Sequence, residues 1–213
     1  MYRESVVKRI VSGMRVLDCG GVDHWAFEQK SASGEWLHDI ICTHATSCLG
    51  VDILDDNVRR INDIGKYRFE AKNVESMDFS AEFDVVVAGE IIEHIYNAGL
   101  FLDSCWRALK PDGKLLITTP NAYSLSAMLS AIFFRKEMCH PEHTCYYSRQ
   151  TLRYIVSRHG FEIEELHVLP RRSNFKLIEW MRGLLSSASP LVADTLVLVA
   201  KKLPQQNKYT GKW

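Results

Sequence analysis

The sequence lacks a run of apolar residues long enough to cross a bilayer, which takes about 20 of them. Residues 1–14 carry charges throughout and lack the apolar core of a signal peptide. Neither sign of charge is in surplus, because 26 Lys and Arg residues balance 26 Asp and Glu residues. Nucleic-acid-binding proteins usually have a basic surplus. We therefore expect a cytoplasmic protein with no transmembrane segment and no nucleic-acid partner.

The cysteines do not have the spacing of a disulfide scaffold. Six of them are scattered along the chain, at positions 19, 42, 48, 105, 139 and 145. This scatter is typical of reduced and mostly buried thiols. The sequence also lacks internal repeats and low-complexity segments, so its 213 residues are expected to form one domain, residues 1–213.

Short apolar runs alternate with segments of helical periodicity along the whole chain. Strands are expected over residues 15–18, 48–52, 67–71, 85–87, 114–119, 161–169 and 195–200. Helices are expected over residues 4–11, 36–45 and 100–109, with a further helix capped by Ser148 and another capped by Asp55 or Asp56. Residues 110–113 predict a turn. This alternation predicts an α/β fold with a mainly parallel sheet.

The stretch from Phe83 to His94 is the most informative one. Its consecutive valines predict a strand buried on both faces. Glu90, Glu93 and His94 follow at positions i, i+3 and i+4. If a helix begins at Glu90, all three side chains project from one face of its first turn. They would then lie beyond the carboxyl end of a buried strand, where open α/β sheets bind ligands.

Several stretches, taken in order, resemble the class I S-adenosylmethionine-dependent methyltransferases over nearly the whole chain. These stretches are residues 16–21, 50–52, 73–75, 83–94 and 109–121. Within that class, the sequence is most similar to the ubiquinone-biosynthesis O-methyltransferase type. The resemblance implies a Rossmann-like, seven-stranded, mainly parallel sheet with helices on both faces and an antiparallel last strand.

The resemblance also implies which residues bind S-adenosylmethionine. Asp18 would reach the amino group of the methionine moiety, Asp52 both ribose hydroxyls, and Asn73 the adenine amino group. The full implied set is Asp18, Cys19, Gly20, Gly21, Asp52, Ile53, Asn73, Val74 and Ala88. Val22-Asp23 stands where the family usually has a third glycine.

Glu90, Glu93 and His94 resemble the metal site of small-RNA 2′-O-methyltransferases, which a later histidine completes. Here residues 139–145 supply His140 and His143, and His143 is the better positional match. The resemblance implies a Mg²⁺, Mn²⁺ or Zn²⁺ site formed by Glu90, Glu93, His94 and His143. It also implies that Glu93, His94 and His143 are catalytic. The alternative, in which Glu93 and His94 only form local hydrogen bonds, stays open.

We therefore expect an enzyme that transfers the methyl group of S-adenosylmethionine to a hydroxyl of a small molecule, sugar or lipid-linked acceptor. A metal-independent N- or C-methyltransferase and a non-catalytic nucleotide-binding module of the same fold are the alternatives. Two lid-like insertions are expected near residues 122–147 and 170–190. Each of them could equally be an ordinary packed helix. The second could also contact a membrane surface peripherally.

Overall fold

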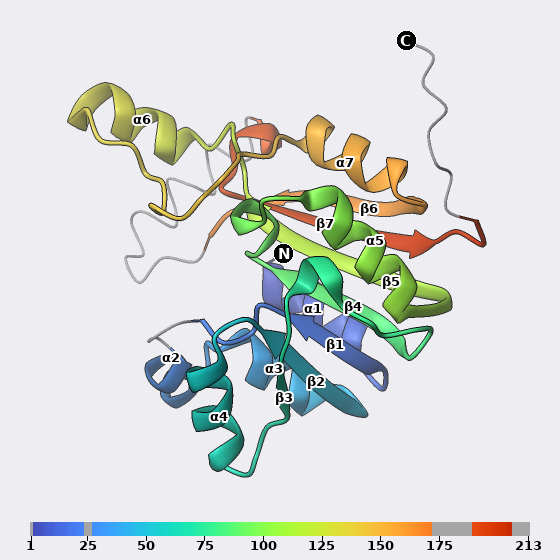
Figure 1. The fold of residues 1–213 in the computed structure, drawn as a ribbon. Coiled ribbons are helices and arrows are strands. Elements are labelled where there is room, and N and C mark those ends of the chain that lie inside the picture. The colour runs from blue at the N-terminus through green and yellow to red at the C-terminus, as the bar shows by residue number, and fades with distance from the viewer. Residues whose placement is uncertain (1, 24–26, 172–188, 206–213) are drawn as a thin grey trace.

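The computed structural model describes residues 2–23, 27–171 and 189–205. These residues form one seven-stranded sheet with the strand order β3-β2-β1-β4-β5-β7-β6 (Figure 1). The strands are β1 (Arg15–Cys19), β2 (Ser47–Asp52), β3 (Phe69–Ala71), β4 (Phe83–Gly89), β5 (Leu109–Pro120), β6 (Phe161–Leu169) and β7 (Thr195–Lys202). The first five pair in parallel, whereas β7 is antiparallel to β5 and β6. The expected fold class is thus confirmed.

Helices cover both faces of the sheet (Figure 1). One face carries α1 (Arg3–Val11) and α3 (Leu37–His44), and the other carries α5 (Ala98–Ala108) and α7 (Arg149–Arg158). The remaining helices are α2 (Phe27–Ser33), α4 (Asp55–Asp63), α6 (Leu125–Phe134) and the 3₁₀ turns η1 (Val74–Ser76), η2 (Ile92–His94) and η3 (Pro190–Val192). Of these, α2 and α4 pack beside β3, whereas α6 projects from the body of the protein.

Successive residues of the central strands point to opposite faces of the sheet. In β1, Val16 packs in the apolar cluster under α1 and α3, whereas Leu17 packs in the cluster under α5. Because side chains along a strand alternate with a period of two, Asp18 must point to the same face as Val16. A carboxylate is thereby placed beneath α3.

Two local predictions are wrong. Neither Asp55 nor Asp56 caps α4, which begins after Leu54 without a side-chain cap. Both acids lie instead in the first turn, where negative charge favours the helix dipole. Residues 110–113 do not form a separate turn but belong to β5, in which they lie opposite Asp84 as a bulge.

The start of α7 follows the sequence prediction. Ser148 caps this helix by accepting a hydrogen bond from the Thr151 backbone N–H, and the Thr151 side chain accepts one from the Ser148 backbone. This reciprocal pair is a capping box, which satisfies two amide groups that the helix leaves unbonded.

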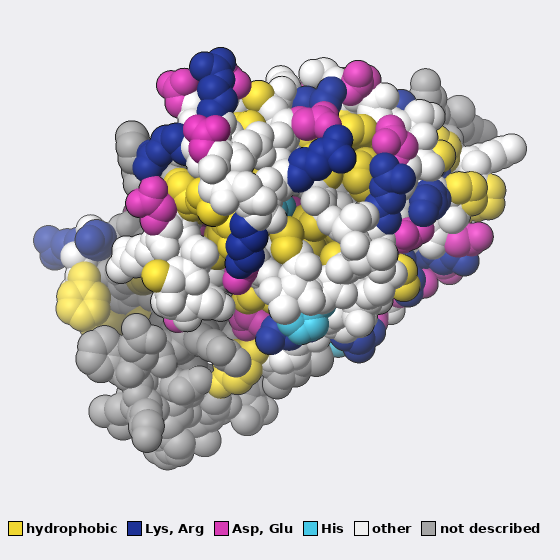
Figure 2. Space-filling model, turned by 90° about the horizontal axis from the view of Figure 1, so that it is seen from below, with side chains coloured by type: hydrophobic (Ala, Val, Ile, Leu, Met, Phe, Trp, Pro, Cys, Tyr) yellow, Lys and Arg dark blue, Asp and Glu magenta, His cyan; other side chains and the backbone are white. Residues whose placement is uncertain are grey.

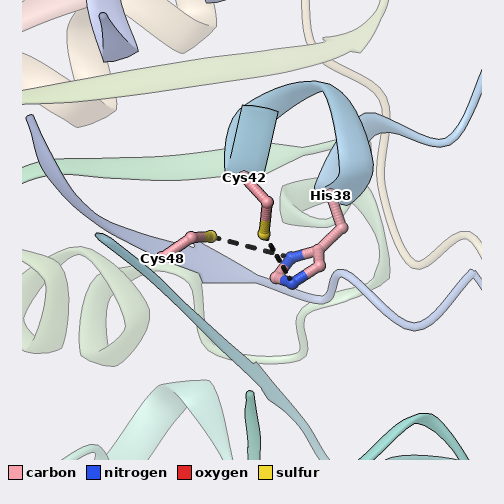
Figure 3. Close-up of side chains that lie close together, drawn as sticks. All are labelled: His38, Cys42 and Cys48. Carbon is pink, nitrogen blue, oxygen red and sulfur yellow. Dashed lines mark hydrogen bonds between the residues drawn. The ribbon is translucent and has the colours of Figure 1, made fainter. Parts of the chain in front are cut away.

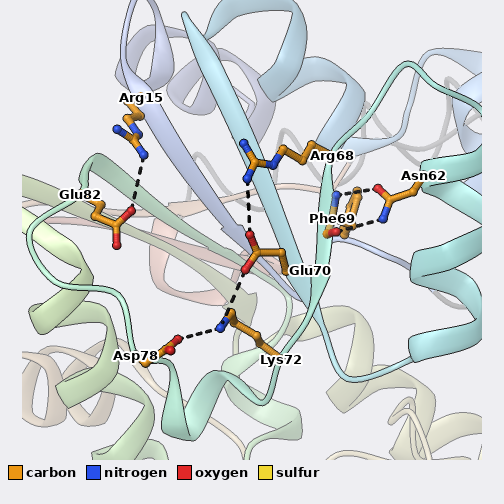
Figure 4. Close-up of polar contacts among 8 residues, drawn as sticks. All are labelled: Arg15, Asn62, Arg68, Phe69, Glu70, Lys72, Asp78 and Glu82. Carbon is orange, nitrogen blue, oxygen red and sulfur yellow. Dashed lines mark hydrogen bonds and ion pairs between the residues drawn. The ribbon is translucent and has the colours of Figure 1, made fainter.

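The edge strand β3 is covered by an amide side chain from α4 (Figure 4). Asn62 Nδ2 donates to the Phe69 carbonyl at 3.0 Å, and the Phe69 N–H donates to Asn62 Oδ1 at 2.8 Å. Asn62 therefore takes the place of a further strand, and it blocks pairing with another chain at this position.

Replacing Asn62 with alanine is expected to lower the free energy of unfolding by about 1–3 kcal/mol, because two backbone groups lose their partner. Asn62→Asp is the matched variant, since it keeps the acceptor for the Phe69 N–H but loses the donor. Asn62→Asp should lower the free energy of unfolding by less than Asn62→Ala does. Urea denaturation measures both, and a wild-type midpoint for Asn62→Ala would contradict this role.

Within residues 2–23, 27–171 and 189–205, no helix is long and apolar enough to cross a membrane. On the face shown in Figure 2, basic and acidic side chains are interspersed. This agrees with the balanced composition of the chain. The cytoplasmic location stays a prediction.

Candidate active site

The carboxyl ends of β1, β2, β4 and β5 meet at one edge of the sheet. Cys19 at the end of β1 pairs with Val51 on one side and Ala88 on the other, and Gly89 pairs with Thr118. The residues that follow these strands are therefore neighbours in space, although they lie far apart in the sequence. Most of the predicted site residues belong to this group.

The loop after β1 is held by three hydrogen bonds. The Gly20 N–H donates to the Val51 carbonyl at 2.8 Å, and Trp36 Nε1 donates to the Gly21 carbonyl at 2.8 Å. The Val22 N–H donates to Asp52 Oδ2 at 3.2 Å. Trp36, which is 1% exposed, is a positioning residue that the sequence did not indicate. Its indole fixes the path of the loop.

Two positions in this loop have a left-handed backbone. Gly20 has a φ of 74°, and a Cβ atom there would lie 2.4 Å from Ile91 Cδ1. Any larger residue at position 20 would therefore be both strained and obstructed. Asp23 has a φ of 54°, so it adopts the conformation for which glycine is usual. Aspartate tolerates this region better than most residues do.

Asp52, at the end of β2, has a preorganised carboxylate. It is 7% exposed, and Oδ1 accepts a hydrogen bond from the Leu54 N–H at 3.1 Å while Oδ2 accepts the one from Val22. A carboxylate has about four lone-pair sites, so it can accept several donors at once. The next residue, Ile53, is 70% exposed and offers apolar surface beside this carboxylate.

The other residues of the implied cofactor site lie at the ends of β3 and β4. Asn73 caps η1, because its Oδ1 accepts a hydrogen bond from the Glu75 N–H at 2.9 Å. Val74 is buried, as is Ala88 in β4. The side chains of Val74 and Ala88 are thus part of the core, and a ligand could approach only their backbone atoms.

Asp18 is not exposed to the edge but pairs with a histidine that the sequence analysis missed. Its Oδ2 lies 2.8 Å from His38 Nδ1, and both side chains are buried. Burial opposes charge on the His38 imidazole, but hydrogen bonds with Asp18 and Cys42 outweigh it and raise the pKa of His38 to about 9.

Cys42 and Cys48 also contact this histidine (Figure 3). Cys42 Sγ lies 3.3 Å from His38 Nε2, and Cys48 Sγ lies 3.9 Å from His38 Nδ1. Hydrogen bonding from Cys48, aided by His38, lowers the pKa of Cys42 to about 6 despite its partial burial. Neither cysteine is fully buried, so the prediction of mostly buried thiols holds only for Cys19 and Cys105.

The helix predicted to begin at Glu90 is not formed, and this expectation is wrong. Glu90 has a φ of 54°, and its N–H still donates to the Thr118 carbonyl at 2.8 Å. This bond continues the contact with β5, so the chain turns into a 3₁₀ helix only at Ile92. The Glu90 carboxylate accepts a hydrogen bond from Thr118 Oγ1 at 3.0 Å and lies 3.8 Å from Arg3 Nη1.

Glu93, His94 and His143 nevertheless come together. The Thr144 N–H and hydroxyl both donate to the Glu93 carbonyl, at 2.8 and 2.9 Å, which ties the later loop to η2. One ligand atom from each of Glu93, His94 and His143 lies within 4.8 Å of the other two. His140 is adjacent, with its ring centroid 5.5 Å from that of His94. Glu90 does not belong to this group of three.

The protonation of the group follows from its surroundings. Burial, together with the nearby Glu90 charge, raises the pKa of Glu93 to about 8, although Thr119 Oγ1 donates a hydrogen bond to it at 2.8 Å. Burial and His140 lower the pKa of His143. His143 is therefore mostly neutral at pH 7, as a metal ligand or a general base must be.

The raised pKa of Glu93 predicts a pH-dependent stability in the presence of chelator. A carboxyl that binds its proton more tightly in the folded state contributes stability below its unfolded pKa, and this contribution is lost as the pH rises towards 8. Glu93→Gln removes the effect. Raising the pH from 5 to 8.5 should lower the free energy of unfolding of the wild type by roughly 2–5 kcal/mol relative to that of Glu93→Gln, since a shift of one pKa unit is about 1.4 kcal/mol.

Urea denaturation at several pH values measures this shift. The exposed Glu162→Gln in β6 is the matched control and should run parallel to the wild type. If the free energies of unfolding of Glu93→Gln and wild type changed with pH in the same way, the raised pKa assigned to Glu93 would be contradicted.

The strand order β3-β2-β1-β4-β5-β7-β6 is that of the class I S-adenosylmethionine-dependent methyltransferases. A family profile described as methyltransferase domain matches residues 3–166, and the chain belongs to this family. The ubiquinone biosynthesis O-methyltransferase of Mus musculus, a mitochondrial protein, is 32% identical over 133 residues. That match covers 58% of this chain but only 33% of the relative.

Solved structures share the fold at low sequence identity. An S-adenosylmethionine-dependent methyltransferase from Mesorhizobium loti has a TM-score of 0.63 and 14% identity, covering 93% of this chain and 95% of that one. The N-methyltransferase NodS from Bradyrhizobium japonicum, in complex with S-adenosyl-L-homocysteine, has a TM-score of 0.57 and 12% identity, covering 95% of this chain and 86% of that one. The resemblance inferred from the sequence is thus confirmed.

Proposed function

We propose that this chain transfers the methyl group of S-adenosylmethionine to a hydroxyl of a small molecule, sugar or lipid-linked acceptor, with the help of a divalent cation. The observation that carries this proposal is the convergence of Glu93, His94 and His143 within 4.8 Å. Glu93 and His94 follow β4 in η2, and His143 joins them from the loop between α6 and α7, at the edge where the Gly20 loop and Asp52 lie. Relatives named O-methyltransferases support oxygen as the acceptor atom.

The residues at this edge fit S-adenosylmethionine. The Asp52 carboxylate is held at this edge by the Val22 and Leu54 N–H groups, and a carboxylate is the kind of acceptor that ribose hydroxyls need. The exposed Ile53 side chain can pack against the purine ring. Gly20 and Gly21 leave the loop backbone without side chains, so a ligand can approach it closely. When bound, S-adenosylmethionine supplies an electrophilic methyl group on a sulfonium.

The group after β4 also fits a divalent cation. One carboxylate and two imidazoles are a mixed oxygen and nitrogen set suited to Mn²⁺ or Zn²⁺, and also to Mg²⁺ with water ligands. Ligands that share one ion at about 2.0–2.2 Å lie at most about 4.4 Å apart, close to the observed limit of 4.8 Å. When bound, the cation supplies positive charge that favours the deprotonated form of a nearby hydroxyl.

The chain's own residues can help to remove the proton that the acceptor hydroxyl loses. The reaction forms an oxygen–carbon bond, breaks the carbon–sulfur bond and releases the hydroxyl proton. Where His143 does not hold the cation, its neutral imidazole can accept that proton as a general base. Where it ligates the cation, its lone pair is occupied, and the proton passes to solvent while the cation stabilises the deprotonated oxygen. The Thr144 bonds to Glu93 hold the loop that carries His143, so the base stays near the edge of the sheet. Positioning of the two reactants supplies the rest.

We also propose that residues 122–147 cover an apolar part of the acceptor. The base of this insertion is closed by the Ala122 N–H, which donates to the Tyr147 carbonyl at 2.8 Å. Ser130 is the only buried residue of α6, which favours a covering role for this segment over an ordinary packed helix. The large exposed side chains of α6 are Met128, Leu129, Ile132, Phe133 and Phe134. The segment 170–190 falls almost wholly outside the described residues.

Amide hydrogen exchange in α6 is expected to slow when S-adenosylhomocysteine and an acceptor are both present, because closure protects its amides. Exchange in α7, which is already packed, is the internal control. Equal exchange of α6 in all states would contradict a covering role.

The function is tested by methyl transfer from labelled S-adenosylmethionine to a panel of phenols, catechols, glycans and lipid-linked sugars, with amines as the comparison. Transfer to oxygen that is lost in chelator and restored by Mg²⁺, Mn²⁺ or Zn²⁺ supports the proposal. Transfer to nitrogen that chelator leaves unchanged would favour a metal-independent N-methyltransferase instead.

A further inference from the structure

A second group of metal-ligating side chains lies under α3, on the opposite face of the sheet from α5. We propose that His38, Cys42 and Cys48 bind a soft divalent cation of the zinc class through one imidazole nitrogen and two thiolate sulfurs (Figure 3). Asp18 holds the other imidazole nitrogen. This site is separate from the group of Glu93, His94 and His143, and it does not depend on the acceptor of the methyl group.

The fold itself brings the three ligands together. His38 and Cys42 are four residues apart in α3, so their side chains lie on the same face of that helix. Cys48 follows in β2, where it pairs with Val16 of β1 and points to the same face of the sheet as Asp18. Helix α3 packs on this face and delivers the imidazole between the two thiols.

The distances match those of a shared ion. His38 Nε2 lies 3.3 Å from Cys42 Sγ, and one ligand atom from each of the three residues lies within 4.8 Å of the other two. Around a tetrahedral zinc ion, with Zn–S of about 2.3 Å and Zn–N of about 2.0–2.1 Å, neighbouring ligands are roughly 3.5–3.8 Å apart. Small side-chain rotations are therefore sufficient.

The partner of the imidazole is the strongest evidence for a metal. A histidine that ligates zinc with one nitrogen usually donates its other N–H to a carboxylate, which fixes the tautomer. His38 Nδ1 lies 2.8 Å from Asp18 Oδ2, with the His38 residue fully buried and Asp18 1% exposed. This contact leaves Nε2, which lies 3.3 Å from Cys42 Sγ, as the ligand atom. Cys48 Sγ now lies 3.9 Å from Nδ1, so its side chain must rotate towards Nε2 to share the ion.

The charges and the access route also fit. Two thiolates neutralise a divalent cation, and binding releases to solvent the protons that the Cys42 and Cys48 thiols and His38 Nε2 carry. Cys42 and Cys48 are only half-buried, so an ion can enter from their side while His38 closes the other. Three protein ligands leave a fourth position for water or another small ligand. Soft sulfur donors favour zinc over Mg²⁺ or Mn²⁺, which distinguishes this site from the one after β4.

The experiment uses the full chain, reduced and freed of metal, titrated with Co²⁺ and then with Zn²⁺. Thiolate-to-cobalt charge-transfer absorption is expected, and Zn²⁺ should displace it. Cys42→Ser and Cys48→Ser should each lose this absorption, whereas Cys139→Ser, which lies outside the group, should keep it. Glu93→Gln should keep it too. Asp18→Asn should weaken metal affinity by about 10–100-fold, because the imidazole loses its orienting carboxylate.

Zinc-edge X-ray absorption of the wild-type protein tests the same ligand set without any substitution, in case a variant fails to fold. Two sulfur neighbours and at least one imidazole at the zinc would support the site. Absence of charge-transfer absorption in the reduced wild type would overturn the proposal. Absorption that survives in both Cys42→Ser and Cys48→Ser would overturn it as well. So would a Cys42–Cys48 disulfide whose reduction restores no metal uptake.

Discussion

Glu93→Ala and His143→Ala are each expected to lower the rate of methyl transfer by about 10²–10⁴-fold, the usual contribution of a positioned acid or base. Both residues belong to the group after β4, where one ligand atom from each lies within 4.8 Å of the other and of His94. Affinity for S-adenosylmethionine should change little, because the Asp52 carboxylate and the Gly20 loop do not belong to this group. Single-turnover rates and cofactor titrations measure the two effects separately.

The exposed Glu162→Ala in β6 is the matched control for Glu93→Ala and should keep the wild-type rate. Excess chelator should lower the rate of the wild type as the two substitutions do. Added Mn²⁺ or Zn²⁺ should restore the rate of the wild type but not the rates of the variants. Full activity in excess chelator would rule out the metal mechanism. The assignment to the methyltransferase family would survive that result, because it depends on the fold and the sequence match.

Glu90 shows why the geometry of this group could not be predicted from spacing alone. The pattern Glu90, Glu93 and His94 predicts one helical face, but the backbone of Glu90 remains bonded to Thr118 of β5. A long-range hydrogen bond thus decides where the 3₁₀ helix begins. His143 can reach this group because the end of β5 neighbours the end of β4, a property of the strand order rather than of local sequence.

The strands and most helices could be predicted because their signals are local. Apolar runs and helical periodicity identified all seven strands and gave α1, α3, α5 and α7 to within a few residues. Helix α2 was missed, because residues 27–33 carry little apolar periodicity. Caps and turns depend on single hydrogen bonds, so the predicted helix cap at Ser148 is correct whereas the predicted cap at Asp55 or Asp56 is wrong.

The contacts of the loop after β1 are long-range, so local sequence patterns do not indicate them. The indole of Trp36 reaches the Gly21 carbonyl across fifteen positions, and His38 reaches Asp18 across twenty. One signal was available: His38 and Cys42 at i and i+4 in a predicted helix, with Cys48 at the start of the next predicted strand. The interpretation of the cysteines as scattered thiols did not take account of this spacing.

The identity of the acceptor depends on side chains that the fold does not determine. An N-methyltransferase shares this fold at 12% identity, and an O-methyltransferase matches part of the sequence at 32%. The fold alone therefore does not decide the acceptor atom. Our proposal of a hydroxyl acceptor depends on the imidazoles and the carboxylate of Glu93, His94 and His143, because deprotonating oxygen needs a base and benefits from positive charge.

Asp52→Ala is expected to weaken S-adenosylmethionine binding by about 1.5–3 kcal/mol, or roughly 10- to 150-fold in Kd, because charge-assisted hydrogen bonds to the ribose would be lost. The carboxylate also accepts hydrogen bonds from the Val22 and Leu54 N–H groups, so the loop would lose an anchor as well. Asp52→Asn separates the two effects, since its amide oxygen can still accept one backbone bond but its charge is gone.

Isothermal calorimetry measures the affinities, and circular dichroism checks that each variant is folded. Asp55→Ala, an exposed acid in the first turn of α4, is the matched control and should bind like the wild type. Asp52→Asn should fall between wild type and Asp52→Ala. An unchanged Kd in Asp52→Ala would remove Asp52 from the cofactor site. A wild-type protein that binds no S-adenosylmethionine would contradict the proposed function itself, because every assigned role of this edge depends on that ligand.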